Sequence, residues 1–210
     1  MEDERRAHWD GVYGSRAVTE VSWFESDPAQ SLGLIAEAGT GPGDPVIDVG
    51  GGASVLADRL LAAGYADVTV LDVAAEALAT SRARLGPAAE RVQWLVADVL
   101  SWHPQRRYAL WHDRAVFHFL TDAAARDRYR RTASEALAPG GRMVIGTFAA
   151  DGPTQCSGLP TARYTPQELA AEFPRLELVD SARQEHRTPG GGLQPFTWVL
   201  LADPDPSAKI

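Results

Sequence analysis

Residues 45–54, Pro-Val-Ile-Asp-Val-Gly-Gly-Gly-Ala-Ser, constrain the fold more than any other stretch of this chain. Val46, Ile47 and Val49 form a short apolar run of the kind expected for a strand buried on both faces. Three glycines follow, and residues 53–64 then have the composition of a helix. A strand that runs through glycines into a helix presents free backbone N–H groups and the positive end of a helix dipole to a ligand. The stretch therefore predicts a ligand-binding turn in an α/β domain.

The glycine spacing bears on which ligand this turn would bind. A dinucleotide-binding turn carries glycine at its first, third and sixth positions. Gly50 and Gly52 satisfy the first two, but Val55 stands at the sixth. Asp48 also precedes the glycines, where its carboxylate would repel a pyrophosphate and attract a positive group such as an amino-acid ammonium. A tight glycine turn in another kind of α/β domain fits this stretch as well, so the remaining chain decides.

Composition narrows the class of protein. The 210 residues suit one α/β domain, and 45% hydrophobic with 23% charged residues is ordinary for a globular protein. The net charge of −8 argues against a nucleic-acid partner, since the arginines of residues 126–131 alternate with acids on an expected helix. No stretch is apolar enough to span a bilayer, and the charged N-terminal segment is unlike a signal peptide. Cys156 is the single cysteine, so we expect no internal disulfide and a cytoplasmic protein.

Hydrophobic periodicity and turn residues predict strands that alternate with helices. The expected strands are 46–49, 68–73, 92–97, 108–112 and 143–148, and the expected helices are 28–38, 53–64, 74–85, 122–137 and 166–173. A turn is expected at 139–141, and residues 176–187 and 196–201 predict an antiparallel hairpin before a frayed tail at 203–210. We expect a helical and aromatic segment over residues 1–40 and the main domain over residues 41–204, without a linker between them.

Acidic residues end three successive expected strands. Asp48 lies at the first, Asp72 follows 24 residues later, and Asp98 follows after another 26. The first separation is close to the ~20 residues expected for a second-strand acid that binds ribose hydroxyls. Val73 would then lie against an adenine face, and Asp98 could accept the adenine amino hydrogens. Because parallel strands place their carboxyl ends along one crevice, the three acids together predict a nucleoside-binding site.

These motifs carry a resemblance to a known family. The Asp48-x-Gly50-x-Gly52 turn, Asp72, Asp98, the Pro-Gly-Gly of residues 139–141 and the terminal hairpin resemble the class I S-adenosylmethionine-dependent methyltransferases, in particular small bacterial members. The resemblance covers nearly the whole chain and implies a Rossmann-like three-layer sandwich, whose seven-stranded sheet is mostly parallel with an antiparallel last strand. It also implies S-adenosylmethionine as cofactor and S-adenosylhomocysteine as product.

The same resemblance implies roles for the motif residues. The glycine turn would wrap the methionine part of the cofactor, Asp48 would support its amino group, Asp72 would hold the ribose, and Asp98 with Val99 would hold the adenine. Ser54 departs from the pattern, because many members have a third glycine at this position, but serine is small enough to fit.

Aromatic residues are concentrated near the N-terminus. Trp9, Tyr13 and Trp23 could fold over the mouth of the site as a lid that faces the ligand. The alternative, that they attach an N-terminal extension to the core, fits the sequence equally well. Residues 149–164 are too long for a simple connector, so they are a candidate substrate loop.

A polar cluster follows the fourth expected strand and borders the expected reactive centre. His112, Asp113 and His118 are the candidate catalytic residues, with His186 as a more distant histidine, because histidine titrates near neutrality. His112 is also a candidate for cofactor support, and each lone histidine fits a packing role as well. Asp113 could instead pair with Arg114. Cys156 has no nucleophile motif around it, and no His, Asp or Glu run has metal-ligand spacing, so we expect no required metal.

Four functions fit the sequence. The favoured one is in-line methyl transfer from S-adenosylmethionine to N, O or S of a small molecule. The second is methylation of a protein lysine, although such enzymes commonly carry an Asp-Lys-Gly-like signature after the fourth strand, where this chain has Asp-Arg-Ala at residues 113–115. The third is a cofactor-binding module without catalysis. The fourth is a nicotinamide-dependent oxidoreductase, which Val55 and Asp48 disfavour. The acceptor molecule and the oligomeric state are not predicted by the sequence.

Overall fold

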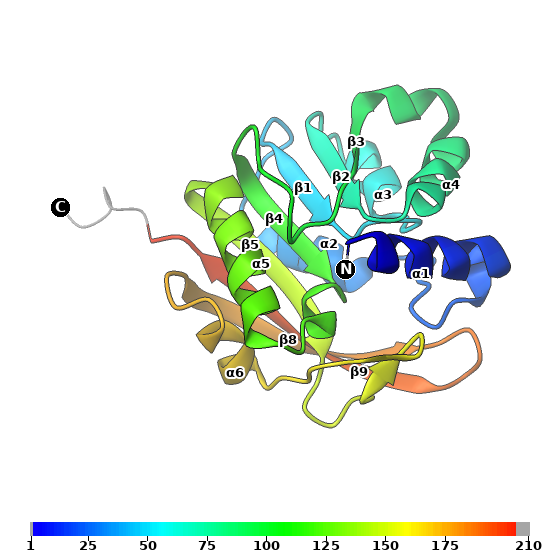
Figure 1. Ribbon diagram of the computed structural model, residues 1–210. Helices are drawn as coiled ribbons and strands as arrows, with labels where there is room; N and C mark the ends of the chain where they lie inside the picture. The colour runs from blue at the N-terminus through cyan, green and yellow to red at the C-terminus, as the bar shows by residue number, and fades with distance from the viewer. Residues whose placement is uncertain (1, 205–210) are drawn as a thin grey trace.

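The computed structural model describes residues 2–204, and its centre is one seven-stranded sheet with the strand order β3-β2-β1-β4-β5-β9-β8 (Figure 1). The strands of this sheet are β1 Val46–Val49, β2 Val68–Asp72, β3 Val92–Val96, β4 Tyr108–Arg114, β5 Leu137–Phe148, β8 Glu177–Arg187 and β9 Leu193–Ala202. The first five pair in parallel, whereas β9 runs antiparallel to both β5 and β8. The predicted fold, mostly parallel with an antiparallel last strand, is confirmed.

Helices cover both faces of the sheet and make it the middle of three layers. The helices are α1 Glu2–Ser15, α2 Ala29–Glu37, α3 Leu56–Ala62, α4 Ala75–Leu85, α5 Ala123–Ala136 and α6 Pro166–Ala171, with the short 3-10 helices η1 Val18–Glu20, η2 Gly86–Arg91 and η3 Phe117–Phe119. Side chains of α2, α3 and α4 pack on one face of the sheet, and those of α5 and α6 pack on the other. Figure 1 shows α5 crossing one face near β4 and β5.

The sequences of the strands explain why the sheet is buried between the helices. Every residue of β1 and β2 is buried, as expected of Val- and Leu-rich strands with a helix on each face. On one face the α5 residue Tyr129 packs beside Trp111 of β4 and accepts a hydrogen bond from its indole N–H at 2.9 Å. On the other face Leu60 of α3 packs in the cluster that includes Val70 of β2. Together these layers fix the carboxyl ends of β1, β2 and β4 along one edge.

Three local elements differ from the prediction. The helix expected at 53–64 begins only at Leu56, because residues 50–55 form the turn and the Ser54 hydroxyl accepts the Leu56 N–H at 3.1 Å. The expected turn at 139–141 lies inside β5 as an irregularity, where the chain leaves the ladder between Leu137 and Arg142 and then rejoins it. The helix after Thr165 ends at Ala171, but Thr165 and Glu168 form the expected capping box.

The N-terminal helix lies outside the main layers, near the carboxyl edge of β1 and β2. Helix α1 contacts α4, and the side chains of Trp9 and Tyr13 pack against Ala53, Ala74 and Ala77. Helix α2, by contrast, belongs to the core on one sheet face. Residues 149–164 contain a two-stranded hairpin, β6 Gln155–Cys156 with β7 Leu159–Pro160. Of the expected tail, Asp203 bonds to the backbone of residues 140 and 141, and residues 205–210 lie outside the described part of the chain.

Across residues 2–204, the structure contains no helix that combines the length and the apolar surface needed to cross a membrane.

Candidate functional site

The main cavity opens at the carboxyl edge of the central strands and encloses about 920 Å³, its open mouth included. It has two ends that differ in chemistry. We call one the carboxylate end, which is lined by Asp72, Val73, Asp98, Val99 and Leu100. We call the other the aromatic end, which is lined by Arg114, His118, Phe119, Phe148, Cys156 and Phe196. Of the site residues that the sequence predicts, Trp9, Tyr13, Trp23, Gly50, Asp72, Val73, Asp98, Val99 and His118 line this cavity.

A smaller cavity of about 560 Å³ adjoins the main one, and Tyr13, Trp23, Gly50 and Arg114 border both. The predicted residues Asp48 and His112 line this smaller cavity. The two cavities together bring nearly all of the predicted residues to one edge of the sheet. Gly52 and Asp113 line neither of them.

The glycine turn needs glycine for steric reasons. Gly50 has a φ of +70° and Gly52 a φ of +40°, a region that side chains with a Cβ rarely adopt. A Cβ on Gly50 would stand 2.0 Å from Val116, and one on Gly52 would stand 2.8 Å from the Asp72 carboxylate. The turn thus brings its backbone directly beside the strand-end acid of β2.

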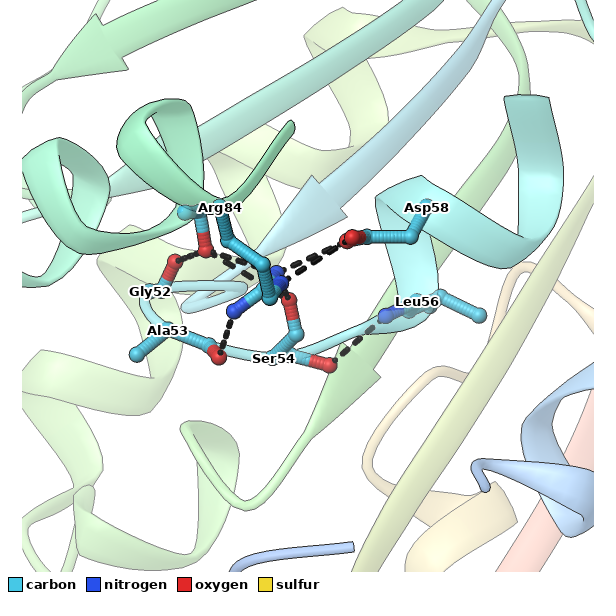
Figure 2. Close-up of polar contacts among 7 residues, drawn as sticks. Gly52, Ala53, Ser54, Leu56, Asp58 and Arg84 are labelled. Atoms are coloured by element: carbon cyan, nitrogen blue, oxygen red, sulfur yellow. Dashed lines mark hydrogen bonds and ion pairs between the residues drawn. The ribbon is translucent and has the colours of Figure 1, made fainter. Parts of the chain in front are cut away.

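Helix α4 fixes the turn from outside, as Figure 2 shows. Arg84 donates to the carbonyl oxygens of Ala53 at 2.9 Å and Ser54 at 2.5 Å, and it also pairs with Asp58 of α3 at 2.7 Å. The Ser81 hydroxyl donates to the Gly52 carbonyl at 2.8 Å. The C=O and N–H of one planar peptide unit point in opposite directions. Because the carbonyl groups of the turn point toward α4, the N–H groups of the same peptide units point away from α4.

Asp48 is buried at the end of β1 and is supported from behind. His112 Nδ1 lies 2.7 Å from the Asp48 carboxylate, and His112 Nε2 lies 3.0 Å from the Ser31 hydroxyl of α2. Both ring nitrogens of His112 are therefore engaged within the protein. This geometry fits a histidine that orients Asp48 better than one that removes a proton from a substrate.

Asp72 is buried at the end of β2 and lines the main cavity. Its Oδ1 accepts the Ala74 N–H at 2.8 Å. Burial raises the pKa of Asp72 to about 7, the Ala74 N–H opposes this, and the nearby charge of Asp48 adds to it. A buried carboxylate with remaining acceptor capacity is suited to bind hydroxyl groups of a ligand.

Asp98 follows β3 and is paired with the N-terminal helix. Its Oδ1 accepts the Leu100 N–H at 3.0 Å, while Oδ2 accepts from Arg5 Nε of α1 at 2.8 Å. Arg5 also lines the cavity. The α1 helix thus occupies one oxygen of the acid that the sequence analysis assigned to adenine.

Asp113 is held by hydrogen bonds from within the protein. It is fully buried and accepts hydrogen bonds from the Val116 N–H at 2.9 Å, the Phe117 N–H at 3.2 Å and the Tyr129 hydroxyl. Burial raises its pKa to about 6, and the Tyr129 hydroxyl opposes the rise. These bonds hold the turn at Ala115, whose φ of +71° is unusual for a residue with a Cβ. The turn directs the following residues toward the cavity.

His118 lies in η3 at the aromatic end and is fully buried. Its Nδ1 accepts the Phe148 backbone N–H at 3.4 Å, and its Nε2 has no hydrogen-bond partner among the described residues. Burial, and next the positive charge of Arg114, lower the pKa of His118 to about 3. The imidazole is therefore neutral in the physiological range.

The N-terminal aromatic residues Trp9, Tyr13 and Trp23 lie beside the cavities. The Trp23 indole N–H donates to the Tyr13 hydroxyl at 3.3 Å, and Trp9 packs edge-on against Trp23 with ring centroids 5.8 Å apart. The backbone oxygen of Trp23 accepts from Arg114 at 2.9 Å. The segment therefore both lines the cavities and packs on the core.

Sequence reasoning missed several residues of the site. Phe148 and Phe196 form a wall from β5 and β9, with ring centroids 5.1 Å apart, and Arg114 lies 4.9 Å from the Phe196 ring. Apolar strand residues give no sign of which cavity they face, so no local pattern identifies this wall. The spacing of Ser81 and Arg84 on one helix face was the available signal for the α4 contacts.

Comparisons with known proteins agree with this geometry. Residues 46–141 match the family model described as a methyltransferase domain. Nodulation protein S of Rhizobium tropici is 30% identical over 156 residues, which cover 72% of this chain and 64% of that protein. The chain thus spans less than two thirds of the length of the curated relatives it matches.

Two solved structures illustrate the shared fold. A SAM-dependent methyltransferase from Anabaena variabilis has a TM-score of 0.75 at 16% identity, over 96% of this chain and 94% of that one. The 1,6-didemethyltoxoflavin-N1-methyltransferase of Burkholderia thailandensis, with bound 1,6-didemethyltoxoflavin and S-adenosylhomocysteine, has a TM-score of 0.69 at 24% identity, over 96% of this chain and 85% of that one.

Proposed function

Because this chain belongs to the class I S-adenosylmethionine-dependent methyltransferases, we propose that it transfers a methyl group from S-adenosylmethionine to N, O or S of a small molecule. The observation that carries the proposal is the set of three carboxylates, Asp48, Asp72 and Asp98, which end β1, β2 and β3 and line two adjoining cavities. Carboxylates suit a cofactor that carries hydroxyls, an amino group and positive charge at its ammonium and sulfonium centres.

We propose that different residues of the site bind different parts of the cofactor. Asp72 would hold the ribose hydroxyls, and Asp98 with Val99 would hold the adenine, with Val73 against it. Asp48 would bind the ammonium group and is oriented by His112. The turn at Gly50 and Gly52 would pass beside the methionine part. Trp9, Tyr13 and Trp23 would cover the bound cofactor, which makes residues 2–25 the proposed lid.

Methyl transfer from S-adenosylmethionine requires little of the protein except alignment of the reacting atoms. Bound S-adenosylmethionine supplies an electrophilic methyl group, and the protein has to exclude water and hold the acceptor atom in line. His112 and Asp113 have their hydrogen-bonding groups engaged within the protein, so we propose that they position the site. We propose no general base among the described residues.

The form of the cavity favours a small molecule over a protein side chain. A lysine-binding groove would be open and acidic, whereas the aromatic end is walled by phenylalanines and carries the positive charge of Arg114. Methylation of lysine and a cofactor-binding module without catalysis remain the alternatives that the experiment below distinguishes. We also propose a cytoplasmic location, which fits a chain with one cysteine and hence no internal disulfide.

Calorimetric titration with S-adenosylhomocysteine, with NAD as control, tests the proposal. We expect micromolar binding of S-adenosylhomocysteine and none of NAD. Radiolabelled methyl transfer to phenols, thiols and heteroaromatic amines, with a lysine-containing peptide beside them, then tests the acceptor class. Absence of S-adenosylhomocysteine binding would refute the cofactor site, and labelling of the peptide alone would favour the protein-methylating alternative.

A further inference from the structure

We infer that His118 is an acceptor-binding residue, whose Nε2–H donates a hydrogen bond to an uncharged planar aromatic methyl acceptor bearing a carbonyl oxygen, a hydroxyl oxygen or an unprotonated ring nitrogen. The inference rests on the proposed function and goes beyond it, since it specifies the substrate class and the role of one side chain.

The protonation of His118 follows from its contacts. Nδ1 accepts the Phe148 N–H, so its lone pair is engaged and the proton of the neutral ring resides on Nε2. Nε2 is fully buried and has no hydrogen-bond partner in the described part of the chain. A buried donor without a partner costs free energy, so a ligand atom that accepts from it is strongly favoured over one that does not. His118 can therefore donate a hydrogen bond to the methyl acceptor, but it is unsuited to remove a proton from that molecule.

Aromatic rings pack around His118 and form one wall of the cavity. The His118 ring centroid lies 4.4 Å from that of Phe119 and 4.5 Å from that of Phe148. Phe196 stands edge-on to Phe148. Trp9 of the lid packs against Phe119 at 5.1 Å. Aromatic side chains of this kind stack on or abut planar ligands over a large apolar area.

The charge of the aromatic end selects against cationic acceptors. The Arg114 side chain lies there with 13% of its surface exposed, pairs with Glu25 at 3.2 Å and keeps an Nε without a hydrogen-bond partner among residues 2–204. The acids that could attract a cation, Asp72 and Asp98, lie at the carboxylate end instead. An alkylammonium acceptor would thus meet a cation and a neutral N–H donor, both unfavourable, whereas an oxygen or unprotonated nitrogen would meet two donors.

Binding of matched probes to the protein loaded with S-adenosylhomocysteine tests the inference. The probes are 2-quinolone and 4-quinolone, which carry a ring carbonyl, together with naphthalene, which has two fused rings but no hydrogen-bond acceptor, and benzylamine, which is a cation. Loss of a hydrogen bond to a buried donor predicts at least about tenfold tighter binding of one of the quinolones than of naphthalene, and no measurable binding of benzylamine. Calorimetry gives each affinity.

Three variants assign the preference to one atom. His118→Phe keeps the aromatic wall and removes the donor, so it should abolish the preference for the quinolone over naphthalene. His118→Gln restores an N–H donor and should retain most of the preference. His103→Phe, a change at an exposed histidine outside both cavities, should leave it unchanged.

The outcomes separate this inference from the proposed function. The affinity for S-adenosylhomocysteine is measured for every variant, and an affinity equal to that of the wild type indicates that the carboxylate end is folded. Failure of the wild type to bind S-adenosylhomocysteine would refute the proposed function. If S-adenosylhomocysteine binds normally, the inference alone would be overturned by any of four results: no quinolone binds, quinolone and naphthalene bind equally, benzylamine binds tightest, or His118→Phe keeps the preference.

Discussion

The carboxylate end and the aromatic end of the main cavity are built on different principles. At the carboxylate end each acid follows its own strand and is fixed by backbone contacts a few residues away, such as the Ala74 N–H on Asp72 and the Leu100 N–H on Asp98. At the aromatic end the wall comes from β4, β5 and β9 and from the hairpin that carries Cys156, segments far apart in the sequence. The first end is locally determined, and the second depends on the assembled sheet.

The two ends also differ in the charge that they present. Buried acids at one end suit hydroxyls and positive groups, whereas Arg114 and the neutral His118 at the other end suit acceptor atoms. Within one continuous cavity, this arrangement would hold the cofactor and the methyl acceptor in a fixed order. The His118 variants disturb the aromatic end, whereas changes at Asp72, Arg84 and Arg5 disturb the carboxylate end.

The largest effect is expected from Asp72→Asn at the carboxylate end. The change keeps the oxygen that accepts the Ala74 N–H but removes the charge that would hold the ribose hydroxyls. Affinity for S-adenosylhomocysteine should fall about 100-fold or more, because charge-assisted hydrogen bonds contribute about 1.5–3 kcal/mol each. Calorimetry measures it, and an unchanged affinity would refute the role of Asp72.

The same variant should be more stable than the wild type at high pH. The folded-state pKa of Asp72 is raised above its ordinary value of 3.8 to about 7, so folding favours the protonated acid. Its contribution to stability is present below pH 4 and is lost as the pH rises through 7. The difference in unfolding free energy between Asp72→Asn and wild type, from urea titrations at pH 5 and pH 8, should therefore shift in favour of the variant at pH 8. A difference that does not change with pH would contradict this.

A smaller effect is expected from Arg84→Met, which removes the contacts of α4 with the glycine turn (Figure 2). Because two backbone carbonyls lose a charged donor, the turn should be less well ordered, and affinity for S-adenosylhomocysteine should fall roughly three- to tenfold. Arg82→Met, an exposed arginine on the same helix, is the matched control and should bind as the wild type does. Equal affinities of the two variants would show that the turn holds its shape without Arg84.

The smallest effect is expected from Arg5→Gln in α1. The Arg5 side chain is 36% exposed, so water screens the pair from that side although Asp98 itself is buried. Removing it frees the Asp98 oxygen for the cofactor, so affinity for S-adenosylhomocysteine should rise roughly two- to fivefold. Arg16→Gln, just beyond the same helix, is the control. Weaker binding by Arg5→Gln would mean instead that Arg5 helps to hold the lid over the cofactor.

The same contrast between local and long-range determinants explains what the sequence could predict. Asp48, Asp72 and Asp98 were identifiable because each directly follows an apolar run, so a strand and its terminal acid appear together in the sequence. The aromatic rings near His118 were not identifiable from the sequence, because Phe148 and Phe196 become neighbours only when β9 inserts beside β5. The start of α3 was predicted too early because Arg84 binds the carbonyls of Ala53 and Ser54 and holds them in the turn, which overrides the strong helix propensity of alanine.

The position of β9 has a consequence for biosynthesis. A ribosome releases β5 first and β8 later, and the strand that must lie between them emerges after both. Until then each of these strands has an unpaired edge, which is a state prone to association with other chains. Phe196 arrives with β9, so a nascent chain can complete its carboxylate end while its aromatic end still lacks a wall. A translational pause or a truncation before residue 193 would therefore leave a chain whose carboxylate end is lined and whose aromatic end lacks the wall that β9 supplies.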